Sequence, residues 1–182
     1  MSDFAFQFLL TLDATLRVAT PLILCAMAGI FSERSGIIDI SLEGKLLMGA
    51  FAAATVASLT GSVWLGVICA IASSVLLVLI HGFACSTHRG NQVVSGLAIN
   101  MLASGLTVTV GIALFRQGGQ TPPLGNTERF RPVEWWFVET FDAIPVFGAI
   151  YRELISNHNI LVYLALVMVP ATALLLYKTR FG

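Results

Sequence analysis

Residues 31–59 (FSERSGIIDISLEGKLLMGAFAAATVASL) are the part of the chain that most restricts what it can fold into. The stretch resembles a membrane span, yet Asp39, Glu43 and Lys45 fall within seven positions of its first half. One ionised side chain near the bilayer centre costs about 2.5–3.5 kcal/mol on insertion scales, so these three cannot face lipid. The residues after Glu43 are mostly apolar and small. The stretch therefore predicts a helix that begins partway into the membrane beside a polar path, an arrangement typical of transporters.

The low content of charge places the rest of the chain in a membrane as well. Of 182 residues, 57% are hydrophobic and 11% are charged, whereas charged residues make up about a quarter of a soluble domain. We therefore predict an all-α fold, a polytopic transmembrane helical bundle that occupies residues 1–182, with its second span broken or partly re-entrant. The five expected spans cover about 14–31, 31–59, 63–84, 92–115 and 160–177. Before the first span, residues 4–12 suggest a short interfacial segment.

Several classes of function lack support in the sequence. Ten basic and ten acidic residues balance and form no basic patch, which argues against nucleic acid as a partner. Cys25, Cys69 and Cys85 lie singly in apolar runs, which favours packing over redox or metal chemistry. His81 and His88 are seven residues apart without a third ligand, so no metal is expected and His81 is interpreted as interfacial. No catalytic residue and no cofactor is predicted.

Two stripes of side chains predict where helices meet. Gly49, Ala53 and Ala57 recur at a spacing of four and would let two helices approach closely. In the fourth span, polar and small residues share one face, namely Gln92, Gly96, Asn100, Ser104, Thr107 and Gly111. A buried amide in hydrocarbon needs partners, so this face should meet another helix or a hydrated path. Contact between helices and a substrate path explain this second stripe equally well.

The long polar excursion of the chain covers residues 116–159. It opens with a turn-rich segment, and residues 133–155 are amphipathic, with Trp135 and Trp136 set among acidic and basic side chains. Tryptophan is favoured at the membrane–water boundary. We predict an extramembrane loop whose amphipathic part lies on the bilayer surface.

Several blocks of the sequence resemble a known family. Residues 32–51 (SERSGIIDISLEGKLLMGAF) resemble the signature of the membrane permease subunits of bacterial ABC importers of the nucleoside or simple-sugar type, related to ribose and branched-chain amino acid permeases. Residues 20–24 (TPLIL), 88–100 (HRGNQVVSGLAIN) and 116–124 (RQGGQTPPL) fit the same group. The resemblance implies a multi-pass protein of the bacterial plasma (inner) membrane with its C-terminus inside, an orientation that the nearly equal basic counts do not decide. The solute stays open among nucleosides, free bases and simple sugars.

The resemblance also implies a complex within membrane lipid. Cytoplasmic ABC ATPase subunits would drive transport, a second permease subunit would complete the path, and a periplasmic or lipid-anchored binding protein would deliver the solute. The sequence contains no Walker A pattern, GxxxxGK followed by Ser or Thr, so ATP hydrolysis is expected on a partner. Such permeases continue past the position of residue 182 into a coupling helix and further spans. This sequence is therefore expected to be the N-terminal part of a permease, unable to transport alone.

Polar groups on the second and fourth spans are predicted to line the solute path. The candidates are Asp39, Ser41, Glu43, Asn91, Gln92, Ser95 and Asn100. An ion-pair network of Asp39, Glu43 and Lys45 that only shapes the fold explains the charges equally well.

Two other classes of function are alternatives to a transporter. An intramembrane enzyme would need Asp39 with Glu43 as acid and base, or a metal triad built on His81 and His88. Neither a Gly-x-Gly-Asp nor a His-Glu-x-x-His pattern surrounds these residues, which argues against an enzyme. The remaining alternative is a structural or regulatory membrane subunit that does not transport, or an inactive truncated fragment.

Overall fold

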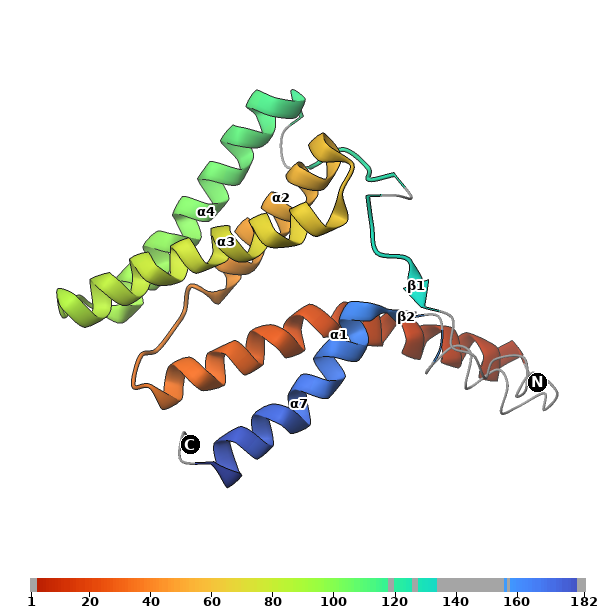
Figure 1. The fold of residues 1–182 in the computed structure, drawn as a ribbon, viewed down its shortest axis with the longest axis horizontal. Coiled ribbons are helices and arrows are strands. Elements are labelled where there is room, and N and C mark those ends of the chain that lie inside the picture. The colour runs from red at the N-terminus through yellow and green to blue at the C-terminus, as the bar shows by residue number, and fades with distance from the viewer. Residues whose placement is uncertain (1–2, 118–119, 126–127, 134–155, 157, 180–182) are drawn as a thin grey trace. The chain divides into compact units, whose positions relative to one another are not determined.

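The computed structural model describes residues 3–117, 120–125, 128–133, 156 and 158–179 (Figure 1). The helices are α1 (Asp3–Arg34), α2 (Leu42–Thr60), α3 (Val63–Gly82), the π-helical turn η1 (Phe83–Thr87), α4 (Gln92–Phe115) and α7 (Ile160–Lys178). Two short strands, β1 (Pro132–Val133) and β2 (His158–Asn159), pair antiparallel with Pro132 opposite Asn159. Helices dominate the described residues, so the predicted all-α class is confirmed.

Five of the helices are long and apolar enough to cross a membrane, as the hydropathy of the sequence predicts. The fourth begins and ends where expected, and the last extends one residue past the expected end. The short segment predicted at residues 4–12 forms one helix with the first span, because α1 runs unbroken from Asp3 to Arg34, and its place at the membrane interface stays a prediction. Residues 3–20 contain neither glycine nor proline, so nothing in the sequence ends a helix there.

The chain divides into two compact units. The first combines residues 1–27 with 130–182, and the second covers residues 28–129. In the first unit, the carboxylate of Asp13 on α1 pairs with Arg17 one turn later at 3.1 Å. The same carboxylate lies 3.3 Å from Nδ1 of the buried His158, just before α7. A polar contact thus joins α1 to the start of the last helix.

In the second unit α2 packs against both α3 and α4, and Figure 1 shows α2 in orange and α3 in yellow side by side. Gly61 ends α2 with a φ of +69°, a left-handed conformation that glycine adopts readily. A Cβ on Gly66 of α3 would lie only 2.7 Å from the carbonyl oxygen of Ala53. A Cβ on Gly49 of α2 would lie 2.7 Å from Oγ of Ser74. The close packing predicted from the small-residue stripe on α2 is therefore confirmed.

A small core forms where these three helices meet. Leu77 of α3 is buried against Ile99 and Ala103 of α4, and Met48 of α2 packs against them. Large apolar side chains elsewhere on the helices stay exposed, Trp64 among them. In a bilayer such apolar surface faces lipid, so the polar groups of this unit gather where helices meet.

Most of the predicted extramembrane loop at 116–159 lies outside the described residues, which omit 134–155. Its described pieces at 120–125 and 128–133 contain no helix. The amphipathic segment predicted at 133–155 stays a prediction.

Candidate functional site

Residues 35–41, here called the connector, join α1 to α2 without helical structure. The turn at Gly36 has a φ of +83°, a conformation that costs glycine little. Backbone groups that are buried in such a segment need partners, because an unpaired buried group is costly. Gln92 on α4 provides two of them. Its side-chain oxygen accepts a hydrogen bond from the N–H of Ile38 at 2.8 Å, and its nitrogen donates to the carbonyl of Gly36 at 3.4 Å.

Asn100, two turns further along α4, bonds the end of the connector in the same way. Its side-chain nitrogen donates to the carbonyl of Ile40 at 3.1 Å, and its oxygen accepts from the N–H of Gly44 at 2.8 Å. Gly96 lies between the two amides, and a Cβ there would come within 3.1 Å of Cβ of Ile40. Glycine therefore allows α4 to approach the connector this closely. These are the contacts expected if the stripe on α4 joins elements of the fold.

A group of five side chains, here called the polar cluster, joins the connector to α2, α3 and α4. Its members are Asp39, Ser41, Lys45, His81 and Ser95. Both Lys45 Nζ and the Ser41 hydroxyl donate to the carboxylate of Asp39. Nε2 of His81 lies 3.8 Å from the same carboxylate, and its Nδ1 lies 3.1 Å from Oγ of Ser95. Lys45 is 6% exposed, His81 3% and Ser41 0%. These three side chains are therefore buried, whereas Asp39 and Ser95 are half-buried.

The charges of the polar cluster compensate each other. Burial by itself raises the pKa of Asp39, but the hydrogen bonds from Lys45 and Ser41 and the charge of Lys45 hold that pKa below its ordinary value. Asp39 belongs to the connector, outside the five helices that could cross a membrane. Removing one partner of a buried ion pair typically costs about 3–5 kcal/mol, because the other charge is left alone. The pair therefore fixes the connector to the first turn of α2.

The interpretation of His81 as an interfacial residue is wrong. Because α3 continues into η1, this histidine does not end the span, and Asp39 and Ser95 offer partners to its ring nitrogens. A signal for its burial exists in the sequence. Leu77, His81 and Cys85 recur at a spacing of four along one face, and all three are buried.

The structure brings together five of the seven side chains predicted to line the path. These five are Asp39, Ser41, Gln92, Ser95 and Asn100. Lys45 and His81, which were not among the predicted path residues, complete the polar cluster. The predicted ion-pair network thus contains the pair of Asp39 and Lys45.

The other two predicted path residues lie at helix starts. Glu43 is exposed in the first turn of α2, where a negative charge suits the helix dipole. Asn91 is exposed and caps α4, since its side chain accepts from the N–H of Val93 at 2.9 Å and of Val94 at 3.2 Å. Neither side chain belongs to the polar cluster.

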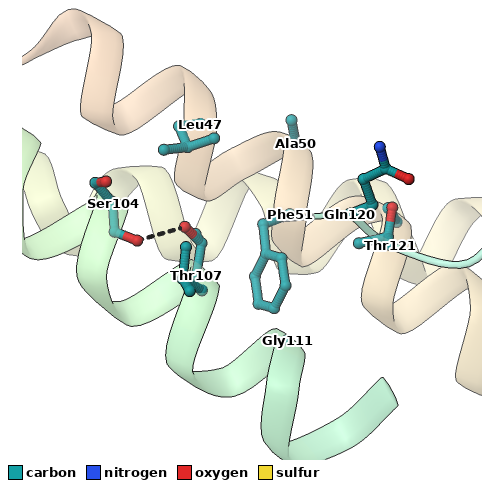
Figure 2. Close-up of a pocket in the computed structure, with 10 residues that line it drawn as sticks. Leu47, Ala50, Phe51, Ser104, Thr107, Gly111, Gln120 and Thr121 are labelled. Atoms are coloured by element: carbon teal, nitrogen blue, oxygen red, sulfur yellow. Dashed lines mark hydrogen bonds between the residues drawn. The ribbon is translucent and has the colours of Figure 1, made fainter. Parts of the chain in front are cut away.

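A cavity of about 560 Å³ opens between α2 and α4 (Figure 2). Its lining includes Phe51 of α2, Ser104, Thr107 and Gly111 of α4, and Gln120 and Thr121 of the following segment. The volume falls in the range of about 300–1,000 Å³ that is usual for ligand sites. The stripe on α4 therefore has two parts: its first half holds the connector, and its second half lines this cavity. Sequence spacing alone does not separate the two.

Comparison with known proteins assigns most of the chain to one family. Residues 11–182 match the family described as "Branched-chain amino acid transport system / permease component". The chain is 37% identical over 175 residues to the guanosine ABC transporter permease protein of Bacillus subtilis, covering 93% of this chain and 52% of the relative. It is 33% identical over 170 residues to the nucleoside ABC transporter permease protein of Lactococcus lactis, covering 90% of this chain and 50% of the relative.

A third relative is named for a different solute. The chain is 32% identical over 172 residues to a protein of Haloferax volcanii provisionally named as a glucose ABC transporter permease protein, covering 94% of this chain and 49% of the relative. The chain thus spans about half the length of these relatives. No solved structure matches it.

Proposed function

Because the chain belongs to the family of permease components of branched-chain amino acid transport systems, we propose that it forms part of the solute path of an ATP-driven ABC importer for nucleosides or simple sugars. The family and the five apolar helices make it a multi-pass protein of the bacterial plasma membrane. The observation that carries the proposal is the family match over residues 11–182. Relatives named for guanosine, nucleosides and glucose support the choice of solutes.

We propose that the chain works in a complex. Its relatives are permease components, which are not enzymes themselves. ATP hydrolysis is then the task of separate cytoplasmic ATPase subunits. A second permease subunit completes the path, and a periplasmic or lipid-anchored binding protein delivers the solute.

Two features of the second unit support a path beside α2 and α4. Hydrogen bonds from α4 hold the connector at the start of α2, and the cavity lies further along the same two helices. For the five predicted path residues that lie together we propose a supporting role, because their polar atoms already bond one another or the backbone. Direct contact of solute with these residues, with Glu43 and with Asn91 stays a prediction.

Uptake of radiolabelled guanosine and glucose into proteoliposomes tests the proposal. The vesicles contain the chain within a full-length permease, together with an ATPase, a second permease subunit and a binding protein. We expect ATP-dependent uptake of at least one solute, lost when the chain is omitted. Equal uptake without the chain would contradict a role in the path and favour a structural or regulatory subunit.

Two variants test whether the residues predicted to line the path matter for uptake. Asp39→Ala and Asn100→Leu should lower the uptake rate per inserted protein, because both loosen the connector. Met101→Leu, at a side chain that is 77% exposed beside Asn100, serves as the control. Unchanged kinetics in both variants would exclude the connector and the polar cluster from the path.

A further inference from the structure

We infer that the cavity between α2 and α4 is a subsite for a nucleoside, held chiefly by its base; this inference rests on the proposed function. The cavity has a volume of about 560 Å³ and lies wholly within the unit of residues 28–129. Nucleosides and hexoses both carry hydroxyls, but only a nucleoside also carries a flat, aromatic base. The chemistry of the walls distinguishes the two solutes.

Most of the wall is apolar. Leucine, alanine, phenylalanine, valine and glycine make up six of its ten residues, and the polar ones are Ser104, Thr107, Gln120 and Thr121. The hydroxyl of Thr107 already donates to the carbonyl of Ser104 at 3.1 Å, as Figure 2 shows. A hexose presents hydroxyls around its whole ring, and each one buried without a partner is costly. The wall therefore disfavours a hexose.

The same wall suits a purine or pyrimidine base. Figure 2 shows the ring of Phe51 between α2 and Gly111 of α4, and a Cβ at Gly111 would lie 3.6 Å from Cε2 of that ring. Every base has an aromatic face that stacks on such a side chain. The amide of Gln120 offers a donor and an acceptor, the combination that the edge of a base requires. Ser104 and Thr121 leave hydroxyls for a ribose.

Gly111 provides a way to narrow the cavity without disturbing the fold. Its added Cβ would meet Phe51 and a backbone oxygen at 3.6 and 3.7 Å, which is ordinary contact, so Gly111→Ala is expected to fold. Gly105 lies on the same helix with nothing within 4 Å of an added Cβ, and Gly105→Ala is the matched control. Both changes raise helix propensity equally, but only the first places a methyl group against Phe51.

The experiment measures guanosine uptake by the assembled importer and photolabelling of the complex with 8-azidoguanosine. We expect Gly111→Ala to raise KM for guanosine about tenfold, the scale of one methyl group in a fitted pocket, and Gly105→Ala to leave it unchanged. Phe51→Leu should also weaken guanosine uptake. In the wild type, unlabelled guanosine should protect against photolabelling, whereas glucose at equal concentration should not.

The outcomes separate this inference from the proposed function. Three results would overturn the subsite while leaving the proposed importer intact. They are an equal KM for guanosine in the two glycine variants, photolabelling away from α2 and α4, and protection by glucose equal to that by guanosine. Absence of uptake of both guanosine and glucose by the wild type would instead overturn the proposed function. If Gly111→Ala and Phe51→Leu lose affinity for guanosine and Gly105→Ala does not, the subsite is supported.

Discussion

The side-chain oxygen of Asn100 on α4 accepts a hydrogen bond from the N–H of Gly44 in α2, 2.8 Å away and 56 residues earlier in the chain. Gly44 is the third residue of α2, where the N–H commonly bonds the side chain of the capping residue. The capping residue, Ser41, makes no such bond, because its hydroxyl donates to Asp39. A residue of another helix therefore caps α2.

Asn100→Leu should destabilise the protein strongly. The change leaves the N–H of Gly44 and the carbonyl of Ile40 without their partner, and each orphaned group costs about 1–3 kcal/mol. Chemical unfolding in detergent measures the difference in free energy of unfolding. Met101→Leu, at an exposed position of the same helix, should unfold like the wild type. Equal stability of Asn100→Leu and the wild type would show that the cap is dispensable.

Lys45→Met should destabilise the protein by about 3–5 kcal/mol, because it leaves the carboxylate of Asp39 buried without its cation. The side chains of the pair are 7% and 9% exposed, so solvent screens them little. The double variant Lys45→Met with Asp39→Asn should recover much of the loss, since no lone charge remains. A double-mutant cycle on the free energy of unfolding measures this coupling. Strictly additive effects would mean that the two side chains do not interact.

Acid should weaken the fold through Asp39. Burial raises the pKa of this carboxyl, but hydrogen bonds and charge from Lys45 and Ser41 bring it below its ordinary value of 3.8. The pKa of Asp39 is thus lower in the folded state than in the unfolded state. The ion pair then contributes its full stability above the unfolded-state pKa, and this stability is lost as the pH falls through the folded-state pKa. As the pH is lowered from about 5 to below 3.8, Asp39→Asn should therefore lose less stability than the wild type.

Thermal unfolding across that pH range makes the comparison. Glu33→Gln removes an exposed carboxylate at the end of α1 and is the control, which should follow the wild type. An identical acid profile for Asp39→Asn and the wild type would contradict the role assigned to the pair.

Gly66→Ala should destabilise the protein although alanine favours helices. The new Cβ would come within 2.7 Å of the backbone oxygen of Ala53, so α2 and α3 would have to separate, and overpacking of this kind costs about 1–3 kcal/mol. Gly82→Ala on the same helix meets nothing within 4 Å and should be neutral or stabilising, by up to about 1 kcal/mol. Unfolding of both variants side by side checks the contact; equal stability would disprove it.

Local sequence was enough to predict five apolar helices, but it set neither the start of α1 nor the partners of the polar side chains. The helix Gln92–Phe115 agrees with the span expected at about 92–115, because a membrane crossing needs about 20 predominantly apolar residues and this segment supplies them. The late start of the second helix could also be expected, since Asp39, Glu43 and Lys45 cannot face lipid. The sequence did not show which of these three charged side chains form an ion pair. Glu43 stays exposed, whereas the other two form a buried pair.

His81 shows why the candidate site could be predicted only in part. Its place near the end of an apolar run suggested an interface, and its partners Asp39 and Ser95 lie on other elements of the fold. In the same way, the spacing of Gln92, Asn100 and Thr107 shows a shared face, but not that the first two bond the connector while the third lines a cavity.

The sequence by itself determined that this chain crosses a membrane with five apolar helices and that its second span starts late, because hydropathy and the cost of burying charge are properties of each segment alone. Only the tertiary structure decided that α4 caps α2, that Lys45 and His81 join the carboxylate of Asp39, and that a cavity opens beside Phe51. Apart from the pair of Asp39 and Lys45, those contacts join residues tens of positions apart. They depend on how closely helices approach, which glycines at the contacts allow and no local pattern specifies.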